Sequence, residues 1–97
     1  MNLAYAPGLL TDDQRIVLHG LYLLLLHGDQ PCRPAALADT INADYNDAGG
    51  HGIAINTPEA VKALPVLVAY GLATDDRGRY SITDGGAEWY ERLGGFR

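Results

Sequence analysis

The chain has 97 residues, which suits one domain with its own core and leaves no room for two. Apolar and aromatic residues make up 47% of it and charged residues 20%, so its composition is that of a folded domain and not of a disordered chain. The net charge of −5 excludes binding of nucleic acid through overall charge, and any such contact needs a local basic patch.

The first predicted helix spans 11–28 and follows an arm at 1–10, which contains a Pro-Gly break and is expected to pack locally. Thr11 and Gln14 have the spacing of a capping box, and Gly28 stands where a helix ends in the left-handed conformation. One broad face of this helix is expected to lie in the core, and its members are Val17, Leu18, Leu21, Leu24 and Leu25.

A second side of this helix is also apolar, because Ile16, Leu23 and Leu26 form a seam there. One interpretation is a partner surface, most simply in a two-fold homodimer, to which Trp89 also contributes. The other interpretation is burial within the chain, under the N-terminal arm or under the last helix with Trp89 and Tyr90. The sequence leaves both interpretations open.

A second helix is predicted at 34–46, with Pro34 in the first position, where its fixed backbone angle suits a helix start. Its buried stripe is expected to consist of Leu37, Ile41 and Tyr45, which recur every four residues. A long glycine-rich joint follows at 44–56, and 52–55 is predicted as a short strand within it.

A third helix is predicted at 57–71, because Thr57, Pro58 and Glu59 supply a cap, a proline and an acid in order. Pro65 is expected to bend it and Gly71 to end it. Its buried face is expected to comprise Val61, Leu64, Val68 and Leu72. Its exposed face is expected to hold Glu59, Lys62, Ala63, Val66, Ala69 and Tyr70.

The segment 72–83 is predicted as a hairpin, with two short strands around an Arg-Gly tip. Tyr80 and Ile82 point to one side of it and are expected to close the open side of the three-helix core. Thr83 is the expected cap of a last helix at 84–94.

The segments 67–73 and 76–86 resemble the corresponding part of bacterial winged-helix regulators such as the MarR and PadR groups. In those proteins the third helix ends in a leucine, two or three further residues and then Gly-Leu. A wing with an Arg-Gly-Arg-Tyr-like tip follows, and a Leu-Thr-Asp-x-Gly-like start opens the next helix. The resemblance implies a mainly α fold with a small β-hairpin wing, a winged helix-turn-helix. It implies one domain over 1–97, with a three-helix core, a two- or three-stranded sheet and a C-terminal helix.

Two features differ from that pattern. The joint at 44–56 is longer than the turn of about 3–4 residues that usually connects the two helices of a helix-turn-helix. In DNA-binding relatives the exposed face of the third helix reads bases, usually with arginine, asparagine or glutamine. Here that face has Lys62 as its one basic residue and offers none of those three side chains.

The candidate DNA contacts are Lys62 and Tyr70 on the third helix, Arg77 and Arg79 on the wing, and Arg33 before the second helix. Each basic residue has a plainer interpretation. The wing arginines can pair with Asp75 and Asp76, Lys62 can pair with Glu59 one turn earlier, and Arg33 can be a solvated loop residue.

Features of enzymes, metal sites and membrane proteins are weak in this sequence. The spacing of His19, His27 and His51 suits no metal site, and no nucleophile has a recognisable base beside it, so we expect no enzyme and no cofactor. The longest apolar run, 21–26, is short against the roughly 20 residues of a membrane span, and the start of the chain lacks a signal-peptide pattern. With Cys32 as a lone thiol, we expect a cytoplasmic protein.

Two functions follow as hypotheses. The first is a winged-helix protein that binds double-stranded DNA as a transcriptional regulator or accessory factor, with dimerisation strengthening weak contacts. The second is a winged-helix module that binds another protein and not DNA, which the acidic balance and the apolar third helix favour.

Overall fold

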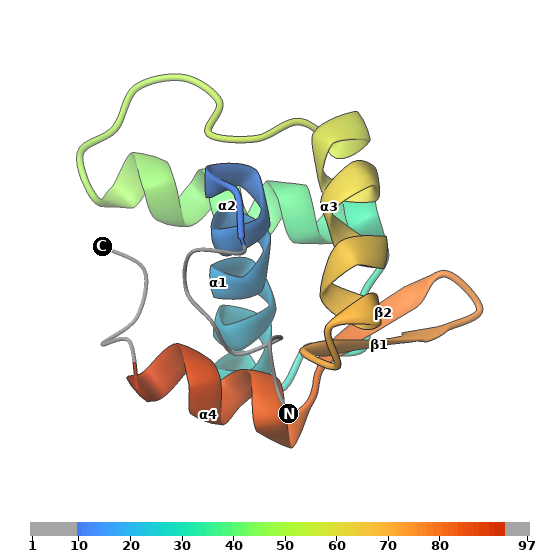
Figure 1. The fold of residues 1–97 in the computed structure, drawn as a ribbon. Helices are drawn as coiled ribbons and strands as arrows, with labels where there is room; N and C mark the ends of the chain where they lie inside the picture. The colour runs from blue at the N-terminus through green and yellow to red at the C-terminus, as the bar shows by residue number, and fades with distance from the viewer. Residues whose placement is uncertain (1–9, 93–97) are drawn as a thin grey trace.

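The computed structural model describes residues 10–92, and its element order is α1 (Asp12–His27), α2 (Pro34–Asp47), α3 (Thr57–Ala69), β1 (Ala73–Asp76), β2 (Arg79–Ile82) and α4 (Asp84–Arg92). Figure 1 shows α1 at the centre, α2 and α3 packed around it, α4 below, and the hairpin extending past α3. The described part is mainly helical with one small antiparallel sheet, as expected. The expected arm at 1–9 and the end of the last helix at 93–94 lie outside the described residues.

Helix α1 begins and ends where its sequence predicts. The backbone amide of Gln14 donates to Thr11 Oγ1 at 3.2 Å and the amide of Thr11 donates to Gln14 Oε1 at 2.9 Å, which completes the capping box. Gly28 ends the helix with φ 73°, a backbone angle that glycine adopts without a steric cost. Leu25, expected in the core, is 40% exposed, whereas Leu24 beside it is buried.

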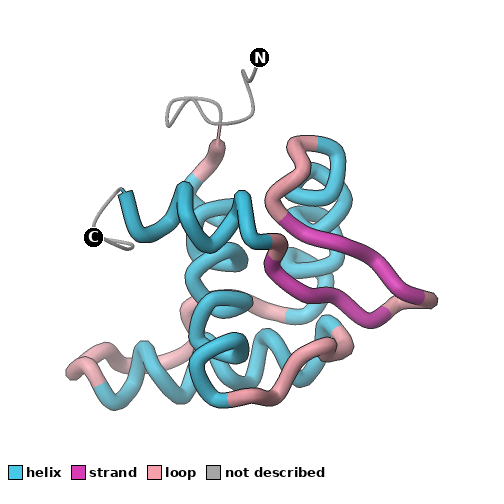
Figure 2. The backbone as a smooth tube through the Cα atoms, turned by 90° about the horizontal axis from the view of Figure 1, so that it is seen from below, coloured by secondary structure: helices cyan, strands magenta, loops and turns pink. Residues whose placement is uncertain are grey.

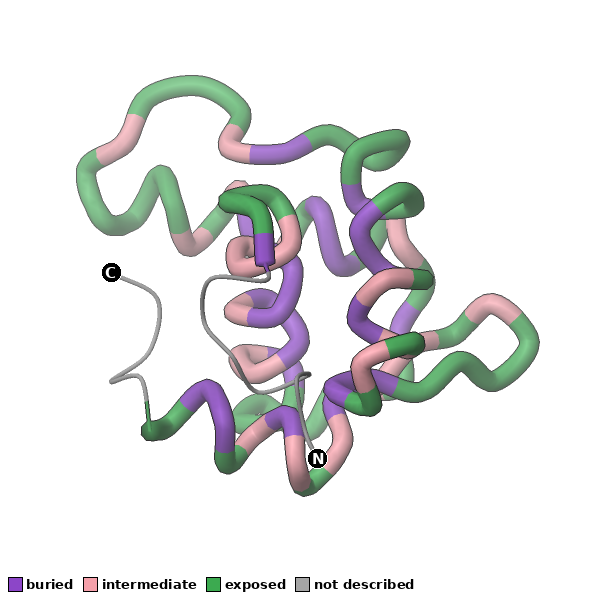
Figure 3. The backbone as a smooth tube through the Cα atoms, viewed as in Figure 1, coloured by how far each residue is buried: buried purple, intermediate pink, exposed green. Residues whose placement is uncertain are grey.

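The core lies between α1, α2 and α3 and is closed by the hairpin and α4, as the purple segments in Figure 3 show. Its largest fully buried side chains are Leu18, Leu21, Leu37, Ile55, Leu64, Leu67, Leu72 and Val17. Gly20 sits where α1 meets α2, and a Cβ there would lie 2.5 Å from Cγ1 of Ile41. The glycine therefore lets the two helix backbones approach closely.

Helix α4 covers much of the second apolar side of α1. The rings of Tyr22 and Tyr90 stack at 4.4 Å between centroids, and Trp89 is only 5% exposed. Trp89 was expected on a partner surface, and this expectation is wrong because the indole packs into the core. Ile16 and Leu23 are half-buried, which leaves Leu26, at 63% exposure, as the exposed member of the predicted seam.

The joint between α2 and α3 is a coil held by Asn42. The Asn42 Oδ1 atom accepts from the amides of Ala54 at 2.7 Å and Ile55 at 3.1 Å, and its Nδ2 donates to the Ile55 carbonyl at 2.8 Å. The predicted strand at 52–55 is therefore wrong, because a side chain takes the backbone groups that a strand partner would need. Tyr45, expected in the buried stripe, is 41% exposed and lies over Gly50.

Helix α3 is rotated about its axis relative to the prediction. Its cap is Asn56, one residue before the expected Thr57, and Glu59 completes a capping box with it. Its buried residues are Ala60, Ala63, Leu64 and Leu67, whereas Val61 is 49% exposed. From the sequence, the larger aliphatic residues Val61 and Val68 were expected to be buried and Ala63 to be exposed. Instead Ala63 is buried, because small side chains let α3 lie close to its neighbours.

The sheet contains the hairpin and one additional paired residue from the segment before α2. Strands β1 and β2 pair antiparallel, with Ala73 opposite Ile82 and Asp76 opposite Arg79. Cys32 forms an isolated antiparallel bridge to Tyr80, through hydrogen bonds of 3.0 and 2.7 Å. Figure 2 shows the magenta strands projecting from the helical body as a narrow extension.

Thr83 joins the hairpin to α4. Its Oγ1 accepts from the Gly86 amide at 2.8 Å, as predicted for a helix cap, and donates to the Gly71 carbonyl at 2.7 Å. Gly71 has φ 75° and ends α3 in the expected left-handed conformation. Within residues 10–92, none of the helices has the length and apolar character to cross a lipid bilayer.

Candidate nucleic-acid interface

The tip of the hairpin holds an arginine in an unfavourable backbone conformation. Arg77 has φ 56° and Gly78 has φ 86°, the two positive angles of a type I′ turn. Asparagine or glycine is the usual first residue of such a turn, and the left-handed conformation costs other residues about 1–2 kcal/mol. Arg77 therefore stands at a site where its side chain brings no benefit to the turn, and that side chain is exposed. Strained positions of this kind gather at functional sites.

Asp75 is engaged within the hairpin and is not the partner of either wing arginine. One of its carboxylate oxygens, Oδ1, accepts from the Gly78 amide at 2.9 Å. Burial of Tyr80, together with the charge and hydrogen bond of Asp75, raises the pKa of the Tyr80 hydroxyl. The plainer interpretation, in which Asp75 neutralises Arg77 or Arg79, has no ion pair to support it within residues 10–92.

The bridge between Cys32 and Tyr80 brings the segment before α2 next to strand β2. Arg33 follows Cys32 and Arg79 precedes Tyr80, so the two arginines are sequence neighbours of an antiparallel bridged pair. Within the hairpin, Arg79 lies opposite Asp76. Arg33 and Arg79 therefore lie in adjacent segments, with Asp76 across from Arg79.

We call Arg33, Arg77 and Arg79 the hairpin arginines. All three are exposed. The salt bridges within residues 10–92 join His19 to Asp44 and Arg92 to Glu88, so the hairpin arginines have no ion-pair partner in that part of the chain. Three guanidinium groups with two nearby carboxylates, Asp75 and Asp76, leave a small excess of positive charge on an acidic molecule.

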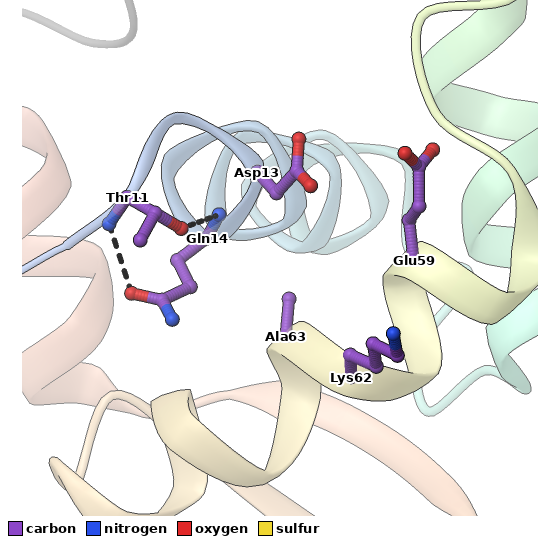
Figure 4. Close-up of a pocket in the computed structure, with 6 residues that line it drawn as sticks. All are labelled: Thr11, Asp13, Gln14, Glu59, Lys62 and Ala63. Atoms are coloured by element: carbon purple, nitrogen blue, oxygen red, sulfur yellow. Dashed lines mark hydrogen bonds between the residues drawn. The ribbon is translucent and has the colours of Figure 1, made fainter.

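Lys62 and Tyr70 lie apart from this patch. Figure 4 shows Lys62 with Asp13 and Glu59 in a pocket of about 240 Å³ between the start of α1 and α3. Two carboxylates therefore share the surroundings of this single ammonium group. Tyr70 is the C-cap of α3, half-buried and packed against the core. Of the five residues predicted to contact DNA, the structure brings together three.

Beyond its first turn, the exposed outer face of α3 is apolar apart from Lys62. Val61, Pro65 and Ala69 are exposed there, and none of them can donate or accept a hydrogen bond through its side chain. Base reading in a DNA groove depends on such hydrogen bonds. This face of α3 therefore offers base edges one donor, the ammonium group of Lys62.

The side chains with acid–base or nucleophilic chemistry lie elsewhere. Cys32 is buried under the hairpin, and this burial raises the pKa of its thiol, which keeps it in the weakly nucleophilic neutral form. The His19 ring is held between the Tyr90 hydroxyl and Asp44. Within residues 10–92, no three His, Cys, Asp or Glu side chains gather in the way that a metal ion requires.

Comparison of the chain with models of protein families, with curated proteins and with solved structures gives no match. The residues and their geometry are therefore the basis for a functional proposal. Arg33 was among the predicted DNA contacts, but its position next to strand β2 could not be predicted, because the bridge between Cys32 and Tyr80 joins segments remote in the sequence.

Proposed function

We propose that this chain is a winged helix-turn-helix protein that binds double-stranded DNA mainly through the phosphate backbone, as a transcriptional regulator or accessory factor. The observation that carries the proposal is Arg77, which keeps a cationic side chain at a left-handed turn position where asparagine or glycine would fit better. Arg33 and Arg79, which lie in adjacent segments, add to this charge. In this proposal the hairpin β1–β2 is the wing.

The balance of charges favours backbone contact over base reading. Arginine side chains bind phosphate oxygens in a forked geometry, whereas the outer face of α3 beyond its first turn offers base edges only Lys62, which shares a pocket with Asp13 and Glu59. Three phosphate contacts predict a slope of about −2.7 for the logarithm of the binding constant against that of the salt concentration. We therefore expect weak binding that depends on salt and little on sequence.

The test is a fluorescence-anisotropy titration of a labelled random duplex at several salt concentrations. Arg33→Ala and Arg79→Ala are each expected to weaken binding and to reduce the salt slope by about 0.9. The matched control is Arg92→Ala, which removes the same charge from α4, where Arg92 pairs with Glu88. No binding at tens of micromolar protein, or an equal loss in the control, contradicts the proposal.

Firm salt-dependent binding uses about 6–10 phosphate contacts. A homodimer would double the three contacts of one chain and so reach this range. The surface that we assign to it is the exposed member of the α1 seam, Leu26, together with its exposed neighbour Leu25. Light scattering tests this: a dimer that Leu26→Asp converts to a monomer supports the interface. A wild-type protein that stays monomeric on concentration contradicts it.

A second function is favoured by one specific observation, the apolar outer face of α3. Val61 is 49% exposed there, and a protein partner would bury it where a DNA groove would not. Val61→Lys separates the two functions. If α3 faces the phosphates, the Val61→Lys variant binds duplex DNA more tightly than the wild type. If the chain is a protein-binding module, neither the variant nor the wild type binds DNA.

A further inference from the structure

A second pocket, of about 480 Å³, opens between α1, α2 and the joint at 48–56. It lies along the C-terminal half of α2, where Asp44 is 11 residues, or roughly 16 Å along the helix axis, from Arg33 at the N-terminal end. None of the functions proposed above uses this pocket. Its volume is within the range of small-molecule sites, about 300–1,000 Å³.

The walls of this pocket are mostly apolar. Ile16 comes from α1, Ile41 from α2 and Ile53 from the joint, and the ring of Tyr45 adds an aromatic surface. Ile53 is 75% exposed, although it is a large aliphatic residue in a coil that Asn42 holds in place. An apolar ligand in the pocket would remove this surface from water.

The polar groups of the pocket are Asp44 and His19. The His19 Nε2 atom lies 3.0 Å from Oδ2 of Asp44, and its Nδ1 atom is hydrogen-bonded to the Tyr90 hydroxyl, so the imidazole is fixed on both sides. The second carboxylate oxygen of Asp44 accepts no hydrogen bond within residues 10–92, and the side chain is 45% exposed. Asp44 thus presents a free acceptor oxygen at the pocket while the histidine holds it in position.

We propose that this pocket binds a small organic cation, an amine carried on an apolar or aromatic body. The ammonium group would donate to the free oxygen of Asp44, and the body would lie against the three isoleucines and the ring of Tyr45. No lysine or arginine lines the pocket, and the net charge of −5 favours a cation over an anion at long range. This proposal does not depend on DNA binding.

The test is an NMR titration of the ¹⁵N-labelled chain with phenethylamine at millimolar concentrations. Saturable shifts are expected at Tyr45, Ile53 and Ala54. Asp44→Asn keeps an acceptor oxygen for His19 and removes the charge, so affinity is expected to fall at least about tenfold. Asp47→Asn is the matched control, an exposed carboxylate on the same helix that does not line the pocket, and its affinity is expected to stay within about twofold of wild type.

A second probe and a second variant keep the test decisive. 3-Phenylpropanoate matches phenethylamine in size but carries a negative charge, and it is expected not to bind. Ile53→Ser changes an exposed residue, so it leaves the fold intact and is expected to weaken phenethylamine binding severalfold even if Asp44→Asn fails to fold. Absence of saturable shifts, equal binding of the anionic probe, or unchanged affinity in a folded Asp44→Asn variant overturns the proposal.

Discussion

Arg77 combines a backbone that would suit another residue with a side chain that the turn does not need. Its φ of 56° disfavours the folded state, while its exposed guanidinium group is free to bind a ligand. At this position the residue that gives the most stable turn therefore differs from the residue that binds an anion. Here, if the guanidinium binds phosphate, the two requirements oppose each other, which makes this position a sensitive test of the proposed function.

Arg77→Asn is expected to raise the free energy of unfolding by up to about 1 kcal/mol, because asparagine tolerates the left-handed conformation. The same change is expected to weaken DNA binding and lower its salt slope. Urea denaturation measures the first effect and anisotropy the second. A stabilised variant with unchanged DNA affinity would show that Arg77 is a turn residue without a binding role.

Cys32 is a residue whose chemistry is set by its place under the hairpin. Burial raises the pKa of its thiol above the ordinary value of 9.0. The folded protein is therefore expected to react with iodoacetamide more slowly than the urea-unfolded chain at the same pH. The pKa of the thiol is higher in the folded than in the unfolded chain. The contribution of Cys32 to the free energy of unfolding is therefore fully present below pH 9.0, the ordinary pKa, and decreases as the pH rises above it. Equal alkylation rates in both states would contradict this burial.

The joint between α2 and α3 shows how one side chain can organise a whole segment. Asn42 satisfies three backbone groups of the joint and so brings Ile55, which is fully buried, into the core. The joint is long and glycine-rich, yet its last residues lead into α3 in one conformation. These contacts fix the path of the chain between α2 and α3 without a short turn.

Asn42→Ala is expected to lower the free energy of unfolding by about 2 kcal/mol, since it leaves the amides of Ala54 and Ile55 without their acceptor. Asn46→Ala, an exposed position on the same helix, is the control and is expected to change stability by less than about 0.5 kcal/mol. Thermal or urea unfolding measures both. Equal effects would show that the joint does not depend on the Asn42 side chain.

Opposite charges lie near the two ends of α2, a helix that crosses the molecule. The hairpin arginines lie at its N-terminal end, and Asp44 and Asp47 lie near its C-terminal end. At about 0.1 M salt the screening length is about 10 Å, roughly half the length of this helix. The two ends therefore act almost independently, so the proposed DNA contact and the proposed cation site place no electrostatic restriction on each other.

This separation gives a prediction about charge. Asp76→Asn removes the carboxylate opposite Arg79 and is expected to raise DNA affinity severalfold. Asp47→Asn changes the net charge equally at the far end of α2 and is expected to have a much smaller effect. Anisotropy titrations near 0.1 M salt compare the two. Equal gains would mean that the net charge, and not the local patch, controls binding.

The sequence by itself determined where most helices begin and end. The capping box of Thr11, the left-handed stops at Gly28 and Gly71 and the cap at Thr83 all depend on groups within a few residues of one another, so local patterns identify them. The hairpin was predictable for the same reason. It was not predictable that its tip would place an arginine in the left-handed region, because turn type depends on the twist of both strands.

Only the tertiary structure decided which helix faces are buried and which distant segments pair. The rotation of α3 follows from the close approach that Ala60 and Ala63 permit, which depends on the helices opposite and not on the size of the residues themselves. The position of Arg33 next to strand β2 likewise comes from the bridge between Cys32 and Tyr80, two residues remote in sequence. Packing and strand pairing are long-range interactions, and a local pattern carries no information about the partner that a distant segment will supply.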